Sequence, residues 1–325
     1  MKALICSEFG STQDLRLETR DDLEPGAGEV LIEVKAAGVN FPDILTVEGK
    51  YQFKPPLPFI PGTEVSGVVS KLGKGVTARQ VGDEVVGMVQ IGGFASQVVA
   101  SEYTTFLKGS SMSFEQAAGF AVTYGTSYYA LKQKAQLQPG ETVLVLGAAG
   151  GVGIATIQIA KAMGATVIAA ASTEEKLDFA CKAGADLRIN YSTDNLKEKV
   201  KELTKGKGAD VIYDPVGGDF SEQAFRAIAW DGRFLVIGFA SGPIPKMPLN
   251  LALLKGASMV GVFWGAWSAR DPKSSQQNFK ELIEMIDGGK FTPLVTEVYS
   301  LDDHSSAFGS IAERRAKGKV ILSMD

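Results

Sequence analysis

Residues 143–153 have the sequence VLVLGAAGGVG, in which an apolar run of branched residues leads directly into a glycine-rich segment. Strands buried in a parallel sheet are apolar throughout, and glycine permits the tight turn that must follow such a strand. The next residues, 152–163, are mostly small or branched and have a helical pattern. We therefore expect a strand, a turn and a helix, with Gly147, Gly150 and Gly153 evenly spaced around the turn.

Five further apolar runs follow at intervals of about twenty to thirty residues, and helical segments separate them. A crossover between parallel strands needs a dozen or more residues, which these segments supply. Six strands joined by five crossovers indicate an α/β fold with a doubly wound, six-stranded parallel sheet of the Rossmann type. The predicted strands are 142–146, 166–170, 187–190, 210–213, 234–237 and 258–262, and the predicted helices are 152–163, 173–183, 193–204, 220–229 and 249–255.

The chain before about residue 110 has short apolar runs separated by Pro and Gly clusters, which is typical of a β-rich barrel or sandwich. Ser113 and Gln116 have the spacing of a capping box and predict the start of a helix. Beyond residue 263 the alternation stops, and the remaining elements have no sheet of their own, so we expect them to return to the N-terminal domain. The expected domains are a discontinuous β-rich domain at 1–120, a Rossmann domain at 121–262 and a return segment at 263–325.

Acidic side chains number 37 and basic side chains 33, which gives a net charge of −4. This balance leaves no basic surplus to attract nucleic acid. No apolar run reaches the ~18–20 residues of a membrane span, and the short apolar N-terminal run is interrupted at Glu8. We therefore expect a cytoplasmic protein with neither nucleic acid nor a membrane as partner.

The cysteine and histidine content limits the chemistry further. Cys6 and Cys181 lie far apart, and His304 is the one histidine of the sequence. A disulfide framework, a zinc site of the Cys/His type and a Ser-His-Asp triad are therefore not expected. His304 follows two aspartates at a predicted helix start, where we expect it on the surface.

The glycine-rich turn predicts dinucleotide binding, because bare N–H groups at a helix N-terminus attract a pyrophosphate. The alternative is a tight turn that serves only helix packing. Sites for NAD normally have Asp or Glu about 20 residues after the turn, but residues 169–173 are AAAST. Ser172 is small and polar, and Lys176 one helical turn later suits a 2′-phosphate, although Glu174 and Glu175 share that turn. The sequence favours NADPH over NADH.

Several motifs together point to a known family. They are GVNFPD at 38–43, PGTEVSG at 61–67, YGTSY at 124–128, AGAD at 183–186, INY at 189–191 and GKVIL at 318–322. With them the chain resembles the zinc-free, zeta-crystallin-like quinone oxidoreductases of the medium-chain dehydrogenase/reductase superfamily. The resemblance implies a discontinuous GroES-like catalytic domain beside the Rossmann domain. Where the zinc-containing branch has cysteine and histidine ligands, this chain has Asn40 and Thr63, so the resemblance implies no metal.

The resemblance also implies site residues. Tyr51 matches a tyrosine that lines the substrate cleft and protonates the product in related enoyl reductases, and Asn40 matches a residue near the nicotinamide. Arg314 matches an arginine that reaches the 2′-phosphate, with the adjacent Arg315 as the alternative. Tyr51 and Asn40 are the candidate catalytic residues. The candidate cofactor contacts are Asn40, Thr126, Gly147, Ala148, Ala149, Gly150, Gly151, Val152, Gly153, Ser172, Lys176, Tyr191, Gly238, Phe239, Phe263 and Arg314.

Other interpretations of these residues stay open. Asn40 is also suited to cap a helix beginning at Pro42, and Tyr51 to an exposed loop. Phe263 begins an aromatic stretch that suits a flat ring, a core or a subunit contact.

Three functions remain. The first is metal-free, NADPH-dependent reduction of quinones or similar carbonyl compounds, the second is reduction of enones or enoyl thioesters, and the third is NADPH binding without catalysis. The apolar last Rossmann strand also predicts a homodimer.

Overall fold

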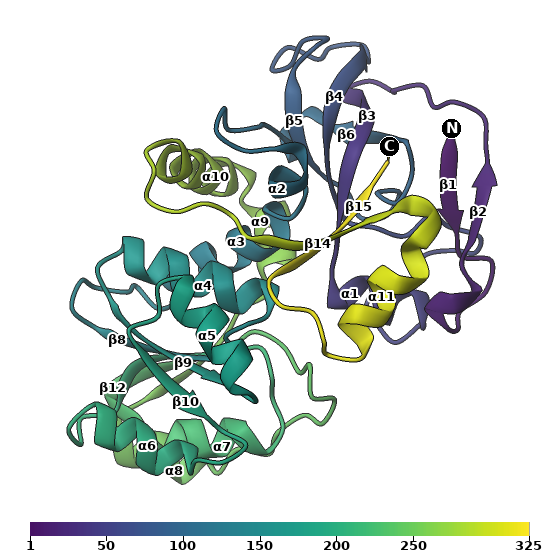
Figure 1. Ribbon diagram of the computed structural model, residues 1–325. Coiled ribbons are helices and arrows are strands. Elements are labelled where there is room, and N and C mark those ends of the chain that lie inside the picture. Colours follow the sequence, from purple (N-terminus) through teal and green to yellow (C-terminus); the bar gives the residue numbers. More distant parts are fainter. Residues whose placement is uncertain (325) are drawn as a thin grey trace. The chain divides into compact units, whose positions relative to one another are not determined.

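The computed structural model describes residues 1–324, which form two compact units (Figure 1). The first unit comprises Met1–Val122 together with the chain from Phe279 onward, and the second is Thr123–Asn278. The first unit is therefore discontinuous, with the second inserted between its two parts.

The second unit is built on a sheet of six parallel strands in the order β10-β9-β8-β11-β12-β13. This order starts at the third strand of the unit, runs back to the first and then continues outward, which is the doubly wound arrangement. The predicted Rossmann sheet is thus confirmed. The strands are β8 (Thr142–Leu146), β9 (Thr166–Ala171), β10 (Leu187–Asn190), β11 (Ala209–Asp214), β12 (Ile228–Val236) and β13 (Ser258–Gly261).

Helices cover both faces of this sheet. In Figure 1, α4 and α5 lie on one face, while α6, α7 and α8 lie on the other. The central strands are buried on both sides, which is why they are apolar without alternation. The helices of the crossovers are α4 (Gly151–Ala162), α5 (Glu174–Lys182), α6 (Leu196–Leu203), α7 (Asp219–Arg226) and α8 (Leu249–Lys255), with α3 (Ala121–Tyr129), a π-helical turn at Ala130–Lys134 and α9 (Trp264–Arg270) outside them.

Two boundaries of the second unit differ from the sequence-based expectation. The helix predicted at 220–229 ends at Arg226, and β12 begins at Ile228, since Ile228 pairs with Ala209 and is fully buried. The unit extends beyond residue 262, because Trp267 stacks on Tyr129 with ring centroids 4.2 Å apart.

The first unit contains a mixed sheet in the order β14-β15-β3-β4-β5-β7, with β6 also paired to β3. The two strands from the return segment join it directly, because β15 pairs antiparallel with β3 and parallel with β14. The tail thus contributes two strands to the sheet of the first unit. The strands are β3 (Glu29–Val39), β4 (Glu64–Leu72), β5 (Glu84–Met88), β6 (Gln97–Ser101), β7 (Thr105–Leu107), β14 (Val295–Ser300) and β15 (Lys319–Ser323), beside a hairpin of β1 (Lys2–Ile5) and β2 (Arg16–Thr19).

The helices of the first unit are short. The predicted capping box begins α2, where Gln116 N–H donates to Ser113 Oγ at 3.2 Å and Ser113 N–H donates to Gln116 Oε1 at 2.9 Å. The helices are α1 (Phe41–Val47), α2 (Phe114–Ala118) and α11 (His304–Ala312), with 3₁₀ turns at Thr12–Asp14, Glu102–Thr104 and Leu301–Asp303; α10 (Pro272–Asp287) spans the boundary between the units.

The surface expectation for His304 is wrong. Its side chain is buried, and Nδ1 lies 3.2 Å from the carbonyl oxygen of Leu301, one turn earlier in the chain. This contact holds the ring against its own chain at the start of α11.

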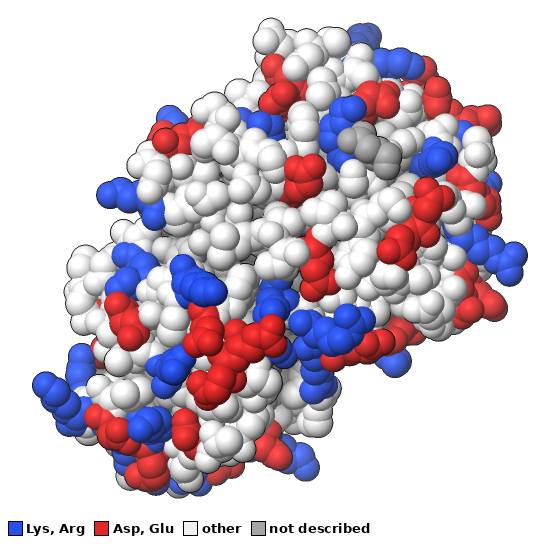
Figure 2. All heavy atoms as spheres, in the orientation of Figure 1, with Lys and Arg blue, Asp and Glu red and all other residues white. Residues whose placement is uncertain are grey.

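Charged side chains of both signs intermix on the face shown in Figure 2. Among residues 1–324, no helix combines the length and the apolar character needed to cross a membrane.

The turn between β8 and α4 depends on a close backbone approach at Gly153. A Cβ at this position would lie 2.5 Å from the carbonyl oxygen of Gly147 and 2.7 Å from that of Ala148. Both distances are shorter than van der Waals contact. Glycine at 153 therefore allows the first turn of α4 to pack on the residues that precede it.

Replacing Gly153 with alanine should destabilise the protein by about 1–3 kcal/mol, the usual cost of overpacking. Gly265 in α9 is the control, because a Cβ there meets nothing within 4 Å. Alanine at 265 should be neutral or stabilising, since it favours the helix over glycine. Urea unfolding of both variants measures the difference, and equal midpoints would contradict the close-approach argument.

Candidate functional site

The candidate residues fall into two groups that belong to different units. Asn40, Tyr51 and Arg314 lie in the first unit. The glycine-rich turn and the remaining candidate cofactor contacts lie in the second unit. Each group has its own internal geometry.

The glycine-rich turn ends in an open helix N-terminus. Gly150 is the N-cap of α4 and has no side chain to cap the first-turn N–H groups. Gly150 N–H itself donates to Gly147 O at 3.0 Å, which closes the turn. Because the N–H groups of residues 151–153 begin the helix, they point away from the helix body and are available to an anion.

A buried network of hydroxyl groups holds the start of α4 from behind. Ser127 Oγ and Thr156 Oγ1 both donate to the carbonyl oxygen of Val152, at 3.2 and 2.7 Å. Tyr213 OH lies 3.1 Å from Ser127 Oγ, and burial raises the pKa of Tyr213 to about 12. Tyr213 thus stays neutral at physiological pH. Ser127 directly follows Thr126, so the same network fixes the helix that carries this candidate.

The end of β9 has no carboxylate, as the sequence indicates. The strand ends at Ala171, Ser172 is half-buried, and Thr173 caps α5 by accepting a hydrogen bond from Lys176 N–H at 3.3 Å. Ser172 O also accepts a hydrogen bond from Ser192 Oγ at 2.9 Å, which joins the segment after β9 to the segment after β10.

The acidic residue nearest this point has other partners. Glu174 Oε1 accepts a hydrogen bond from Asn190 Nδ2 at 2.9 Å, and Glu174 Oε2 lies 3.7 Å from Arg188. Beside this pair, Tyr191 packs on Phe220 with ring centroids 4.3 Å apart. These contacts occupy Glu174, while the exposed Glu175 shares the first turn of α5 with Lys176.

Asp214 organises the loop after β11. Its buried carboxylate accepts hydrogen bonds from Val216 N–H at 2.8 Å, Gly217 N–H at 2.9 Å and Ser221 Oγ at 2.5 Å. Burial raises the pKa of Asp214. The loop that it holds packs on the segment after β12, because a Cβ at Gly217 would lie 2.9 Å from the ring of Phe239.

The other candidates in this part of the second unit follow the sheet strands. Gly238 and Phe239 come just after β12, and Phe263 comes just after β13, where it is 61% exposed. The carboxyl ends of parallel strands share one edge of a sheet, and ligands of such sheets bind at that edge.

In the first unit, Asn40 belongs to a buried polar cluster that we call the Lys319 cluster. Its members are Asn40, Asp43, Glu64 and Lys319, each less than 10% exposed. Lys319 Nζ lies 2.6 Å from both Glu64 Oε1 and Asn40 Oδ1, and Asn40 Nδ2 donates to Glu64 Oε1 at 2.8 Å. Asn40 is also the N-cap residue of α1, where it forms a capping box with Asp43, whose Oδ2 accepts a hydrogen bond from Asn40 N–H at 2.7 Å.

Asp43 is the titratable member of the cluster. Burial raises its pKa to about 7, and the charge of Glu64 adds to this, while the N–H of Asn40 at 2.7 Å and the charge of Lys319 act against it. Thr63 Oγ1 also donates to Asp43, at 3.4 Å. Tyr51 is half-buried, and burial together with the charge of Asp43 raises the pKa of Tyr51. Tyr51 therefore keeps its proton at neutral pH.

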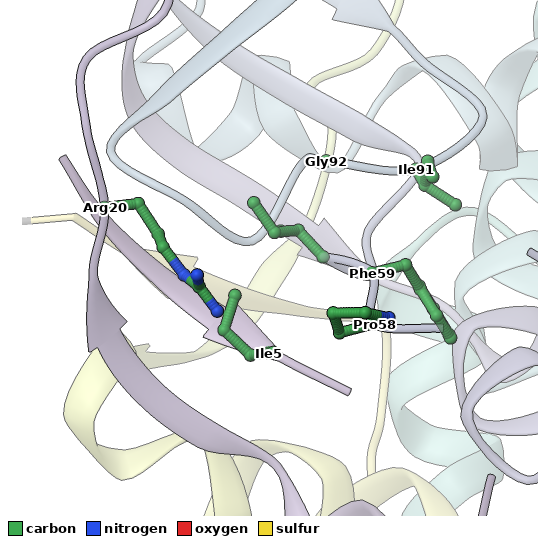
Figure 3. A pocket seen from close by; sticks show the side chains of 7 residues that line it. Ile5, Arg20, Pro58, Phe59, Ile91 and Gly92 are labelled. Atoms are coloured by element: carbon green, nitrogen blue, oxygen red, sulfur yellow. The ribbon is translucent and has the colours of Figure 1, made fainter. Parts of the chain in front are cut away.

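One surface pocket of the first unit involves none of these residues. It has a volume of about 330 Å³ and lies beside the β1–β2 hairpin (Figure 3). Ile5 and Arg20 line one part of it, and Pro58 and Phe59 line another. Arg20 pairs with Glu18 at 2.7 Å, so the cationic group at this pocket already has a counter-ion.

Comparison with known proteins identifies the family. The family model described as "Alcohol dehydrogenase GroES-like domain" matches residues 26–130, and the one described as "Zinc-binding dehydrogenase" matches residues 151–288. The chain is 42% identical to a quinone oxidoreductase-like protein 2 homolog of Nematostella vectensis, over 99% of this chain and 88% of the relative. It belongs to the quinone oxidoreductases of the medium-chain dehydrogenase/reductase superfamily.

Solved structures of this family superimpose on the whole chain. A quinone oxidoreductase of Escherichia coli, solved in complex with NADPH, has a TM-score of 0.91 at 31% identity and covers 99% of this chain and 100% of its own. The CurK enoyl reductase has a TM-score of 0.91 at 30% identity, with coverage of 100% and 99%. The family assignment and the GroES-like plus Rossmann fold predicted from the sequence are therefore confirmed.

Zinc, which the name of one family model implies, does not fit the Lys319 cluster. An amide and a hydroxyl, from Asn40 and Thr63, are poor zinc ligands beside Cys, His and carboxylate. Moreover, Lys319 Nζ already provides a positive charge at 2.6 Å from the Asn40 and Glu64 oxygens. Among residues 1–324, no group of three or more His, Cys, Asp and Glu side chains has a metal-binding arrangement.

The raised pKa of Asp43 predicts a pH-dependent stability. The folded protein holds the Asp43 proton up to about pH 7, whereas an ordinary aspartate releases it near 3.8. The folded state therefore binds the extra proton between these values, and its stability falls as the pH rises through them, by up to about 1.4 kcal/mol per pH unit. Asp43→Asn removes this contribution. The free energy of unfolding of the variant, measured with urea, should therefore rise relative to that of the wild type between pH 5 and pH 8.

The exposed Asp21 provides the control. Asp21→Asn should follow the wild-type pH dependence throughout. If Asp43→Asn does the same, the Asp43 carboxyl does not titrate in the way that its burial implies.

Proposed function

We propose that the protein uses NADPH to reduce quinones or similarly activated carbonyl compounds by direct hydride transfer without a metal. The observation that carries this proposal is the anion-binding turn at α4 together with the missing carboxylate after β9. The E. coli relative with NADPH and the relatives named quinone oxidoreductase support it.

Different residues of the chain bind different parts of NADPH. The N–H groups at the start of α4 bind the pyrophosphate, since an anion there gains from the helix dipole. Ser172 and Lys176 bind the 2′-phosphate, with Tyr191 beside them and Arg314 as the further candidate from the tail. Thr126, Gly238, Phe239 and Phe263 complete the dinucleotide contacts.

Bound NADPH supplies a hydride from its reduced ring. Without a metal to polarise an oxygen, the substrate must itself be electron-poor, as a quinone is. Asn40 and Thr126 orient the reactants, and much of the rate comes from this placement. Tyr51 holds a proton at its hydroxyl and delivers it to the product, a role in which water is the alternative.

The second candidate function is reduction of an enone or enoyl thioester. The similarity to the CurK enoyl reductase favours it, as does the raised pKa of Tyr51, which keeps a general acid protonated. The two functions differ in their need for that acid, because an enolate carbon requires a positioned proton and a hydroquinone anion takes one from water.

Lys176→Ala should weaken NADPH binding by about 1–3 kcal/mol and leave NADH binding almost unchanged, because only NADPH brings the 2′-phosphate. Fluorescence titration of both cofactors measures the effect. Lys182→Ala, at the exposed far end of α5, is the matched control and should alter neither affinity. Equal affinity of the unmodified protein for NADPH and NADH would refute the cofactor assignment.

Tyr51→Phe should separate the two candidate reactions. Quinone turnover should fall only modestly, whereas enoyl reduction should fall ~10²–10⁴-fold, the usual contribution of general acid catalysis. Steady-state assays against a panel of quinones, enones and enoyl thioesters measure both. Tyr103→Phe, at a 63% exposed position, is the control and should leave both rates unchanged.

The same assays, repeated after removal of metal ions, test the metal-free mechanism. Activity should survive dialysis against a chelator, and loss of all turnover under that treatment would rule the mechanism out.

We also propose a homodimer through the β13 edge of the second unit. β13 is an edge strand, and unpaired edges attract another strand. The nearby helix α8 exposes Leu249, Leu253 and Leu254 by 65–81%, and Trp230 at the start of β12 is 70% exposed. Such a concentration of exposed apolar side chains is typical of an interface.

Sedimentation velocity at micromolar concentration should give a dimer for the wild type and a monomer for Leu253→Glu. Val81→Glu, which changes an exposed valine of the first unit, should remain dimeric. A monomeric wild type would exclude the proposal.

A further inference from the structure

Lys319 is a buried lysine with a complete set of partners. It is 5% exposed and begins β15, a strand that follows the whole second unit in the chain. Its three N–H donors meet Asn40 Oδ1 and Glu64 Oε1 at 2.6 Å each and Val39 O at 3.0 Å. Glu64 is fully buried, and its second oxygen accepts a hydrogen bond from Val122 N–H at 2.8 Å. The pair is thus completely hydrogen-bonded.

These partners fix the orientation of the Asn40 amide. An ammonium group can only donate hydrogen bonds and a carboxylate can only accept them. Oδ1 must therefore face Lys319 and Nδ2 must face Glu64, so the flipped amide would lose both contacts. A Cβ at Gly38 would lie 2.5 Å from Glu64 Oε1, which shows how tightly the chain encloses this arrangement.

One N–H of Asn40 makes only a long contact within the protein. Nδ2 carries two protons, of which one goes to Glu64 at 2.8 Å. The other partner of Nδ2 is Gly38 O at 3.4 Å, beyond the usual 2.7–3.2 Å of a hydrogen bond. This N–H is therefore weakly used in the protein and can be given to a ligand at little cost.

Lys319 also strengthens that donor. The positive charge of Lys319 Nζ, 2.6 Å from Oδ1, draws electron density from the amide and acts against the opposite effect of the Glu64 carboxylate on Nδ2. Such effects are larger in a low-dielectric interior. A buried ion pair is weak evidence for stability on its own, because desolvation offsets the attraction between the charges. The Lys319–Glu64 pair, however, contacts the amide of Asn40, a candidate catalytic residue, and this position indicates a role in the reaction.

We propose that Lys319 is a positioning residue, which acts through Asn40 to hold one strengthened N–H donor toward the oxygen of a carbonyl substrate. The proposal rests on the proposed function. The hydride brings an electron pair to a substrate carbon, the displaced π pair moves to the conjugated oxygen, and that oxygen then takes a proton from Tyr51 or water. A fixed donor at this oxygen stabilises the charge as it develops.

The test replaces the ion pair as a unit, because Lys319→Met alone would leave Glu64 charged and buried. In K319M/E64Q, glutamine still accepts from Val122 N–H. Its kcat for quinone reduction should fall about 10²–10³-fold, the usual effect of losing one such donor, with the Kd for NADPH unchanged. K108M/E84Q is the control, since Lys108, whose side chain is 7% exposed, pairs with the exposed Glu84 at 3.0 Å in the same unit. Its kcat should stay at the wild-type value.

A second comparison separates positioning from stability. If Lys319 acts through Asn40, K319M/E64Q should change kcat less than twofold in an N40A background. An undiminished effect there, or a wild-type kcat in K319M/E64Q, would overturn the proposal.

A third measurement does not depend on activity. The side-chain amide of Asn40 should give a ¹H–¹⁵N signal that exchanges slowly with solvent in the wild type and rapidly in K319M/E64Q. If the wild type reduces no quinone or enone, the proposed function fails while this signal still tests the positioning. An Asn40 signal that is the same in both proteins would overturn the positioning itself.

Discussion

A charge removed from water must be compensated, and the first unit is organised around one such compensation. Lys319 and Glu64 are buried against each other and share Asn40 as a partner, while Lys319 also donates to Val39 O and Glu64 accepts from Val122 N–H. These groups come from the end of β3, the start of β4, the start of α3 and the start of β15. One ion pair therefore ties together four segments that are distant in the sequence, and Asp43, beside it, acquires its unusual pKa from the same burial.

In the second unit, neutral hydroxyl groups support the ligand-binding turn from behind. Its turn between β8 and α4 leaves N–H groups open toward a ligand, so the opposite side of the turn must be rigid. Ser127, Thr156 and Tyr213 provide this rigidity through hydroxyl contacts at 2.7–3.2 Å, and no charge is buried there. A neutral support leaves the electrostatic field at the helix start undiminished, which favours the binding of an anion.

Sequence analysis predicted the parallel sheet well, because buried strands have continuous apolar runs and each run ends in a turn. It placed the end of the helix at 220–229 too late, because Ile228 and Ala229 are as apolar in a strand as in a helix. It expected His304 at the surface from its aspartate neighbours, but the ring is buried, with Nδ1 3.2 Å from Leu301 O. Motif comparison selected Asn40, yet spacing alone did not reveal Lys319 and Glu64, since their partners are set by tertiary contacts.

The discontinuity of the first unit affects the order in which the two units can fold. Residues emerge from the ribosome in sequence, and domains tend to fold as units when their residues are available. The second unit is complete at Asn278, before β14 and β15 exist. During that interval Glu64 lacks its counter-ion and β3 lacks one of its neighbouring strands. The first unit can thus acquire its full core and its fixed Asn40 amide only after the whole second unit has been synthesised.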